Sequence, residues 1–324
     1  MLTEVILIIL GFIFLIKGAD LLVEAATNIA KRFGLSEMLI GLTIIAIGTS
    51  LPEVFVTIVS SVDGHSDLII GNAIGSCICN FLLVIGITSL IRPVKLDKRI
   101  INRHLPIGMA AMALLLYLGN ITMFNHSQII TRGQGVFLLL CTVAYVIYTI
   151  YEEKQLKNEI IENELEEQAE SIKNYSLFKT ILYLVIGVIG LKFGADFVVD
   201  NSVIVAKEFN LSEKFIGMTI VAIGTALPEI ITGIIAAKKD ETNLLLGNIS
   251  GSNILNLCLL IGLGAVINPL SFSLDFNLSI LVLIMVTLFL QLVSVLNDKS
   301  ELSRGKGFLL ITIYILYIIS MIAE

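Results

Sequence analysis

The sequence AIGTSLPE, residues 46–53, places a glycine, two hydroxyl residues, a proline and a glutamate inside a long apolar run. Pro52 lacks an N–H group and its ring clashes with the carbonyl group four residues back, so a helix must kink or break there. Carbonyl groups freed by a break are tolerated at membrane depth only where they face protein or line a polar cavity. The stretch therefore predicts a broken helix with a polar site at the break.

The composition of the chain indicates that this apolar run crosses a membrane. Of 324 residues, 56% are hydrophobic and 15% are charged, and the mean hydropathy is +0.94. The apolar stretches are mostly about 17 to 25 residues long, the length of a helix that crosses the hydrocarbon layer. We expect an all-α polytopic membrane protein without strands. The net charge of −6 comes mainly from one acidic segment, and it does not indicate a nucleic-acid partner.

A second copy of the stretch, AIGTALPE, occupies residues 222–229. Aligning residue n with residue n + 176 matches the halves without a gap from Gly18 to Pro93, with about 34 identities in 76 positions. Similarity on this scale indicates an internal duplication. We predict five helices in each half, near residues 5–30, 39–61, 69–91, 105–121 and 134–151, and near residues 178–203, 215–237, 245–267, 276–297 and 306–322.

Five helices in each half require the repeats to have opposite orientations in the membrane. With both termini outside, roughly 16 Lys and Arg residues fall in inside loops, about 3 outside and about 2 within helices, as the positive-inside rule demands. We therefore predict two inverted five-helix repeats, residues 1–151 and 178–324, with broken helices 2 and 7 at the centre. Many secondary transporters have this architecture. The acidic segment 152–177 is predicted to be a solvated, partly helical cytoplasmic linker.

Two carboxylates lie near the centres of predicted spans. Glu53 and Glu229 occupy equivalent positions in the two breaks, and an acid at membrane depth is costly enough to indicate a functional site. A protonated glutamate that only bonds a neighbouring helix is the structural alternative, and the symmetric pair argues against it. Thr49 and Thr225 each precede a glutamate by four residues, so each pair shares one helix face.

The third helix of each half repeats this spacing. Ser76 and Asn80 lie four residues apart, as do Ser252 and Asn256. The glycines of the GNAIGS and GNISGS motifs let these helices approach a neighbour closely; packing alone would explain the glycines but not the amides one turn further on. Hydroxyl, amide, carbonyl and carboxylate oxygens are the ligands of hard cations.

The remaining reactive residue types do not indicate an enzyme. The chain contains no HExxH or CxxC motif and no nucleophile–base arrangement typical of an intramembrane protease. The cysteines all lie in apolar segments, where reduced packing residues are expected and a soft-metal site is the alternative; they are Cys77, Cys79, Cys141 and Cys258. We expect no cofactor and no obligatory protein partner besides the lipid bilayer.

The motifs GTSLPE followed by GNAIGS, and GTALPE followed by GNISGSN, closely resemble the two alpha-repeats of the sodium/calcium exchanger family within the calcium:cation antiporter superfamily. The resemblance covers about 76 residues in each half, and the ten-helix layout extends it over nearly the whole chain. It implies a core of helices 2, 3, 7 and 8 that holds four cation positions in a diamond. Helices 1 and 6 would slide across this core.

The resemblance also implies a role for each polar residue. Glu53 and Glu229 would bind Ca2+, with Thr49 and Thr225 completing its shell. The residues expected to help coordinate Na+ are Ser50, Ser76 and Ser252, with the carbonyl groups of Ala46 and Ala222. Asn80 and Asn256 would flank the central position.

Three features of the chain depart from the family pattern. Ala226 stands where a serine is common, so one hydroxyl ligand is missing from the second repeat. Asn80 and Asn256 are both amides, whereas some relatives carry an acid at one of these positions. Cys77 stands opposite Asn253, where the family usually has Asn. Only two carboxylates remain, enough to neutralise one Ca2+ or two Na+.

The expected function is secondary antiport of Ca2+ against Na+ by alternating access across a plasma (inner) membrane. The same fold with H+/Ca2+ exchange, or with K+-dependent Na+/Ca2+ exchange, stays open because glutamates can carry protons. A passive cation channel built from the same residues is a more remote alternative, since inverted repeats are typical of transporters.

Overall fold

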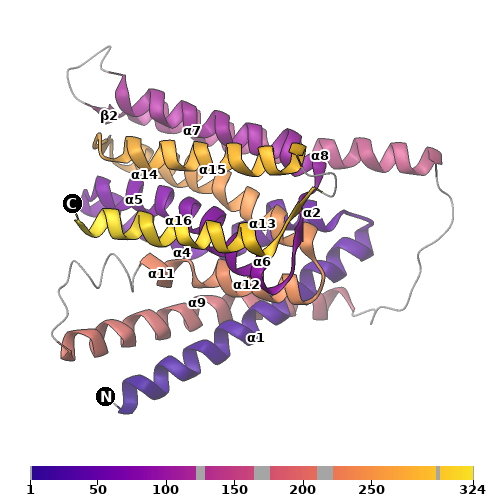
Figure 1. The fold of residues 1–324 in the computed structure, drawn as a ribbon, viewed down its shortest axis with the longest axis horizontal. Coiled ribbons are helices and arrows are strands. Elements are labelled where there is room, and N and C mark those ends of the chain that lie inside the picture. Colours follow the sequence, from indigo (N-terminus) through magenta and orange to yellow (C-terminus); the bar gives the residue numbers. More distant parts are fainter. Residues whose placement is uncertain (1, 122–127, 164–175, 210–221, 297–299, 324) are drawn as a thin grey trace.

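The computed structural model describes residues 2–121, 128–163, 176–209, 222–296 and 300–323, which are almost entirely helical (Figure 1). The first group of helices runs without interruption. It comprises α1 (Leu2–Phe33), α7 (Leu105–Asn120), α8 (Arg132–Asn163), α9 (Leu177–Glu208), α15 (Phe276–Leu296) and α16 (Arg304–Ala323). A short π-helix, η3 (Ile100–His104), leads into α7. The helix α8 continues past residue 151 into the acidic segment, whose residues 164–175 lie outside the described part.

The second group of helices is interrupted, and it contains both proline motifs. Its first segment is α2 (Glu37–Ile40), η1 (Gly41–Ile45), α3 (Ala46–Thr49) and α4 (Leu51–Asp63); its second is α5 (Ser66–Ile78), η2 (Cys79–Val84) and α6 (Ile85–Ile91). In the other half, α11 (Ala222–Thr225) and α12 (Leu227–Lys238) precede α13 (Thr242–Ile254), η5 (Leu255–Leu260) and α14 (Ile261–Ile267). The predicted helix over residues 215–237 falls partly outside the described residues.

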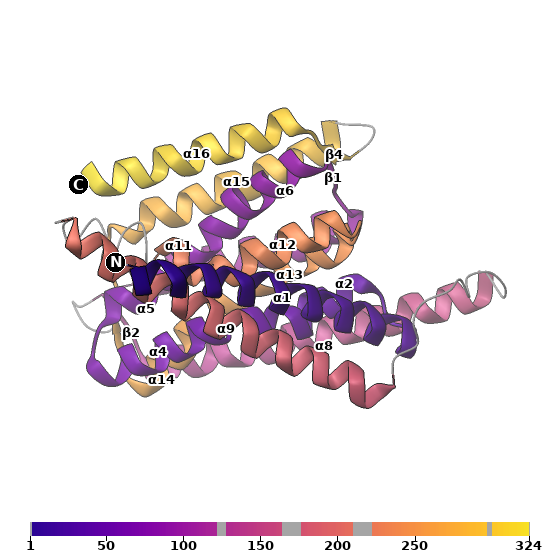
Figure 2. The same cartoon turned by 90° about the horizontal axis from the view of Figure 1, so that it is seen from below.

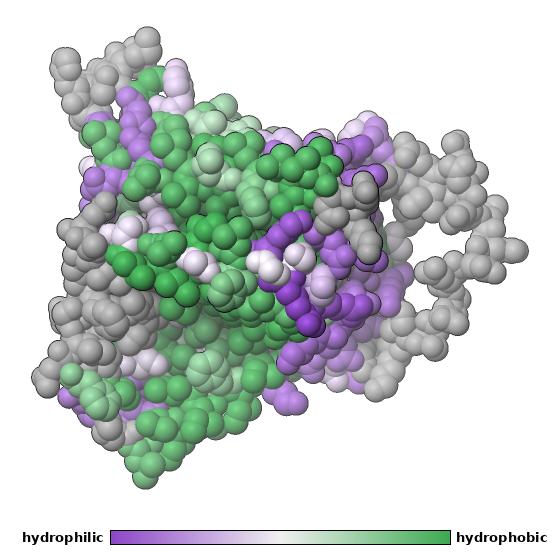
Figure 3. Space-filling model, in the orientation of Figure 1, coloured by the Kyte–Doolittle hydropathy of each residue, from purple (hydrophilic) through white to green (hydrophobic). Residues whose placement is uncertain are grey.

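The length and apolarity of the helices confirm a polytopic membrane protein. In the described part, eight helices are long and apolar enough to cross a membrane, or nine if Glu37–Thr49 and Leu51–Val62, bent by 46°, form one span. Figure 3 shows hydrophobic side chains across the middle of the molecule, with hydrophilic ones gathered toward the right-hand end. A surface of this kind suits a bilayer, because lipid tails contact apolar residues as readily as a protein interior does.

Equivalent helices of the two halves lie side by side and run in opposite directions. Figure 1 shows α1 and α9 together, with α1 starting at the end of the molecule where α9 finishes. A Cβ atom built on Gly11 would lie 2.8 Å from the carbonyl oxygen of Gly194, and one on Gly18 would lie 2.9 Å from that of Gly187. Gly11 is equivalent to Gly187, and Gly18 is equivalent to Gly194, by the offset of 176. The two contacts are therefore the same contact seen from the two halves. The helices α1 and α9 are therefore related as inverted repeats require.

Two short strand pairs join the loops, although the sequence predicts none. The strand β1 (Val94–Lys95) pairs with β4 (Glu301–Leu302), and β2 (Ile129–Ile130) pairs with β3 (Leu270–Ser271), both antiparallel. The two pairs lie at opposite ends of the molecule in Figures 1 and 2. The strands β1 and β3 occupy equivalent residues in the two halves, 176 positions apart. Their location at opposite ends of the molecule is what an inverted repeat predicts. Strands of two residues carry no detectable alternation, so the sequence could not reveal them.

Burial distinguishes the central helices from the peripheral ones. The most apolar window of the α13–α14 segment is 83% buried and that of α5–α6 is 72% buried, against 28% for α1 and for α9. Figure 2 shows α16 and α8 on opposite flanks. The contact of α6 with α16 is made at Gly86 and Gly307, and that of α14 with α8 at Gly262 and Gly135. The polar motifs therefore lie in the best-buried part of the bundle.

Candidate functional site

The two breaks in the proline motifs have the same backbone geometry. Ser50 lies between α3 and α4 with φ −84° and ψ 4°, and Ala226 lies between α11 and α12 with φ −88° and ψ 0°. Pro52 and Pro228 each fall in the first turn of the following helix, where the missing N–H group has no intrahelical acceptor to lose. The predicted interruption therefore occurs two residues before each proline.

Each break delivers a glutamate to the interior. Glu53 and Glu229 lie in the first turns of α4 and α12, where the helix dipole favours negative charge. Their side chains are 0% and 2% exposed. Neither oxygen of either carboxyl group has a hydrogen-bond partner in the described residues, and the two groups lie close enough for their charges to interact. Such a pair requires a proton or a cation, because a buried unpaired charge is very unfavourable.

The third helix of each half contributes serine and asparagine side chains. Ser76 and Ser252 lie in α5 and α13, and Asn80 and Asn256 lie in the π-helices η2 and η5. All four are buried. Within the described chain, Asn80 Oδ1 and both amide atoms of Asn256 have no hydrogen-bond partner. A π-helix holds one more residue in a turn and is frequent at functional sites.

The hydroxyl and carbonyl candidates around the breaks differ in their surroundings. Thr49 is fully buried, and its Oγ1 donates to the Ile45 carbonyl at 3.1 Å. Ser50 is buried and its hydroxyl has no partner among the described residues. Thr225 is only half-buried. The Ala46 carbonyl accepts the Ser50 N–H at 3.1 Å and lies 3.5 Å from the Thr49 hydroxyl, so a cation there would compete with that hydroxyl for the second lone pair.

At the second break, the Ala226 N–H donates to the Ile223 carbonyl at 3.2 Å, three residues back. Ala222, whose carbonyl is the expected counterpart of the Ala46 carbonyl, is the first residue of α11. The two breaks thus share nearly the same dihedral angles.

Two asparagines that were not among the predicted ligands contact the predicted ligands. Asn248 Oδ1 lies 3.3 Å from Thr49 Oγ1 and 3.4 Å from Ser252 Oγ. Asn253 Oδ1 accepts a hydrogen bond from Asn80 Nδ2 at 3.0 Å. Both asparagines lie in the GNISGSN motif, close to the predicted ligand Ser252, and this position is what could have indicated them from the sequence. Their contacts were not predictable, because the bonded residues are distant in the sequence.

Close helix approach explains the glycines of the second repeat. A Cβ atom on Gly247 would lie 2.5 Å from the Met38 carbonyl oxygen, and one on Gly251 would lie 2.4 Å from that of Leu42. The predicted role of small residues is therefore confirmed at this helix. This close approach brings Asn248 against the bent helical segment from Glu37 to Val62, which carries Glu53. In GNAIGS the predicted role is not seen among the described residues, because a Cβ atom on Gly75 meets nothing within 4 Å and one on Gly71 meets only the Phe276 ring at 3.6 Å.

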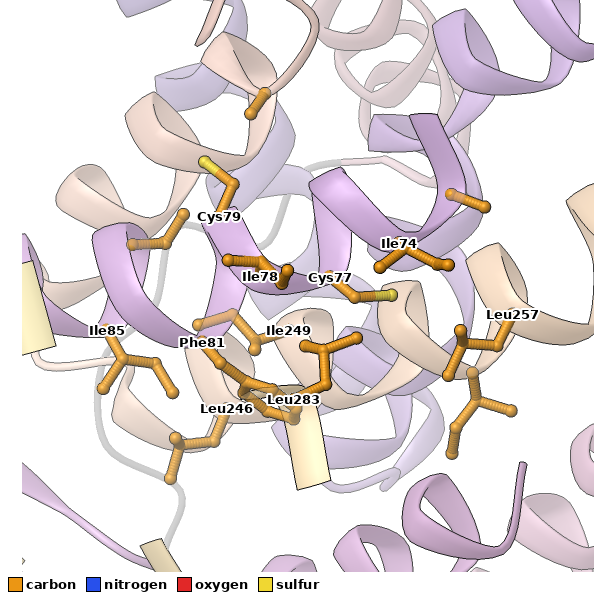
Figure 4. Packing of buried hydrophobic residues seen from close by; sticks show 14 of the residues in the cluster. Ile74, Cys77, Ile78, Cys79, Phe81, Ile85, Leu246, Ile249, Leu257 and Leu283 are labelled. Atoms are coloured by element: carbon orange, nitrogen blue, oxygen red, sulfur yellow. The ribbon is translucent and has the colours of Figure 1, made fainter. Parts of the chain in front are cut away.

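The outlying acids and the cysteines have structural surroundings. Asp20 pairs with Lys239, and Asp196 pairs with Lys192 at 2.7 Å. The four cysteines are free thiols, three of them buried. Figure 4 shows Cys77 and Cys79 packed beside Ile74 and Ile78. Among the described residues, no group of three or more His, Cys, Asp or Glu side chains could hold a metal ion.

The fold and the site together define a helical membrane protein with inverted, duplicated elements and a buried carboxylate pair at two helix breaks. The sequence model of the family described as sodium/calcium exchanger protein matches residues 3–151 and 179–323. The chain therefore belongs to the sodium/calcium exchanger family, which is a family of transporters. The two matched segments lie on either side of the acidic segment.

Individual relatives match along almost the whole chain. Inner membrane protein YrbG of Escherichia coli is 34% identical over 96% of this chain and 94% of its own. Sodium/calcium exchanger MaX1 of Methanosarcina acetivorans is 30% identical over 97% of both chains. A solved structure of the sodium-calcium exchanger NCX_Mj, soaked with zero Na+ and Ca2+, is similar with a TM-score of 0.81 at 31% identity, covering 98% of each chain.

Proposed function

We propose that this protein is a secondary antiporter that exchanges Ca2+ for Na+ across the membrane by alternating access. One observation carries the proposal: the two buried glutamates, Glu53 and Glu229, have four carboxylate oxygens without a hydrogen-bond partner in the described chain. Membership of an exchanger family supports it, and so do the names of MaX1 and NCX_Mj.

The charge of the pair accounts for coupling. Two carboxylates neutralise either one Ca2+ or two Na+, and in a low-dielectric interior they cannot easily remain empty and ionised. The loaded states therefore cross the membrane more readily than the empty state. Because both ions need the same two carboxylates, binding of one excludes the other, and the gradient of one ion drives the other.

The neighbouring oxygens divide between the two cations in this proposal. Ca2+ takes six to eight oxygen ligands, and the carboxylates of Glu53 and Glu229 with Thr49 and Thr225 would supply part of this set. Na+ would use the remaining oxygens. These come from Ser50, Ser76 and Ser252 and from the carbonyl groups of Ala46 and Ala222. Asn80 and Asn256 flank the central position, where their amide oxygens can face Ca2+ as well as Na+.

The pair α1 and α9 is suited to move against the core. Glycines line their mutual contact, and large apolar side chains cover their outer faces. Polar ties to the core lie in the second half of α1, where Thr27 donates to Glu241 and Asp20 pairs with Lys239. Tight packing of α1 against α9 lets the two helices move as one unit, and α1 has few polar ties to the core among the described residues, so little hydrogen bonding must break on sliding.

The proposal is tested by 45Ca2+ uptake into proteoliposomes that contain the purified protein. An outward Na+ gradient should drive uptake, and Glu53→Gln or Glu229→Gln should abolish it, because either change leaves one negative charge for a divalent cation. Asp63→Asn alters an exposed acid on the same helix as Glu53 and should transport normally. Sodium-driven uptake that persists in both glutamate variants would overturn the assignment.

The same assay separates the alternatives on this fold. Uptake driven by a pH gradient without Na+ would indicate H+/Ca2+ exchange, since glutamates can carry the protons. Dependence of the Na+-driven flux on added K+ would indicate K+-dependent exchange. Unitary currents in planar bilayers would instead indicate a passive channel, because a carrier moves only a few ions in each cycle.

A further inference from the structure

The two central amides have different surroundings, although they occupy equivalent positions. Asn80 Nδ2 donates to Asn253 Oδ1 at 3.0 Å, which leaves Asn80 Oδ1 without a partner in the described chain. Neither amide atom of Asn256 has a hydrogen-bond partner there. Both side chains are 1% exposed. Among the described residues, Asn80 is thus held by a neighbour and Asn256 is not.

The sequence difference between the repeats explains this asymmetry. The residue equivalent to Asn253 in the first half is Cys77. Its thiol donates to the backbone carbonyl of Asn253 at 3.5 Å, and Figure 4 shows its sulfur directed toward the segment that carries Leu257. A thiol is a weak donor and a weak acceptor, so Cys77 cannot hold Asn256 as Asn253 holds Asn80.

We propose that Asn253 is a positioning residue that orients the Asn80 amide with its carbonyl oxygen toward the cation, and that Cys77 leaves Asn256 without this support. The inference rests on the proposed exchange function and deepens it. An amide presents either an oxygen or an NH2 group to a ligand, and only the oxygen binds a cation. By accepting from Nδ2, Asn253 selects the favourable orientation at Asn80.

The orientation has a direct consequence for affinity. A side chain that is already held in its binding orientation loses less rotational freedom when the ligand arrives. Asn80 therefore contributes more to cation binding than Asn256 does. Asn253 touches no transported ion, and it acts only through Asn80.

The first test measures initial rates of Na+-driven 45Ca2+ uptake in proteoliposomes as a function of Ca2+ concentration. Asn253→Leu keeps the side-chain size and removes the acceptor, so the apparent KM for Ca2+ should rise roughly fivefold, the effect of one net hydrogen bond, while the maximal rate changes little. In a double-mutant cycle with Asn80→Ala, the double variant should have the KM of Asn80→Ala alone, because Asn253 works through Asn80.

A second variant tests the asymmetry from the other side. Cys77→Asn supplies the missing amide, so the apparent KM for Ca2+ should fall, by roughly two- to fivefold. Cys79→Ser, a change at the neighbouring buried cysteine, should leave KM unchanged.

The outcomes separate the inference from the function on which it rests. If the unchanged protein shows no Na+-driven uptake, the exchange function fails. If the unchanged protein transports, any one of three results would show that the positioning role is wrong. These results are an unchanged KM in Asn253→Leu, additive effects of Asn253→Leu and Asn80→Ala in the double-mutant cycle, or a KM that Cys77→Asn does not lower. Equilibrium 45Ca2+ binding to the purified variants in detergent gives a second measure that does not depend on transport.

Discussion

At the residue scale, Ala226 is the clearest difference between the two breaks. It is 1% exposed and has nearly the dihedral angles of Ser50, so a serine fits the same backbone. We expect Ala226→Ser to add the missing hydroxyl ligand and to lower the Na+ concentration needed for half-maximal exchange, and Ser50→Ala to raise it. The measurement is the Na+ dependence of 45Ca2+ flux; equal Na+ dependence in all three proteins would contradict the role of these positions.

Glu241 provides a prediction about pH. Burial at the start of α13, together with the neighbouring Glu37, raises its pKa from 4.5 to about 7, against the opposing effects of Lys31 and the Thr27 hydroxyl. The folded protein therefore binds this proton more tightly than the unfolded chain does. Its contribution to stability is fully present below pH 4.5 and is lost as the pH rises through about 7.

The expected result is a smaller pH dependence of stability in Glu241→Gln. Between pH 5 and pH 8 the Tm of the purified protein in detergent should fall further for the unchanged chain than for this variant, because glutamine cannot ionise. Asp63→Asn serves as the control, and its Tm should follow the unchanged protein. Parallel Tm profiles for Glu241→Gln and the unchanged protein would contradict the assignment.

At the element scale, the helix breaks were predictable and the π-helices were not. Proline interrupts a helix by its covalent structure, so the breaks at Pro52 and Pro228 can be predicted from the local sequence. The π-helices η2 and η5 contain no proline or glycine. Their extra residue per turn is not a local preference, since π-helices are rare and intrinsically unfavourable. They occur in equivalent places where two buried helices pack, and packing must therefore stabilise them.

The contact between α1 and α9 yields a prediction for helix packing. A Cβ atom on Gly18 would lie 2.8 Å from the backbone nitrogen of Leu191, so Gly18→Ala must separate the two helices. The expected loss of stability exceeds the roughly 0.5–1 kcal/mol that alanine gains over glycine in a helix. Gly305→Ala in α16 meets no atom within 4 Å among the described residues and should be neutral or stabilising. Thermal unfolding in detergent compares them, and equal Tm changes would contradict a tight contact.

At the scale of the whole molecule, the two termini lie at the same end, and the end of α8 projects from the other (Figure 1). We propose that the termini face outside, that residues 1–151 and 178–324 form the two five-helix repeats, and that residues 152–177 form a cytoplasmic linker. His65 lies in an exposed turn near β3, and Lys98 is exposed after β1. These two residues therefore mark opposite faces of the membrane.

Labelling in intact cells tests this orientation. An impermeant thiol reagent should modify His65→Cys from outside, whereas Lys98→Cys should react only after the membrane is opened, because the positive-inside rule places the basic loop in the cytoplasm. Labelling of the unchanged protein is the control, because it measures any reaction of the four native cysteines. Reaction of Lys98→Cys from outside, with protection of His65→Cys, would reverse the proposed topology.

The sequence by itself determined the apolar spans, the duplication at an offset of 176, the two proline breaks and the acids beside them. These features are local or repeat along the chain, so they are visible without coordinates. Only the tertiary structure decided that Asn253 holds Asn80, that Asn248 lies between Thr49 and Ser252, and that α1 contacts α9 through glycines. The bonded residues 80 and 253 are separated by 173 positions, and helix packing alone determines which distant side chains meet.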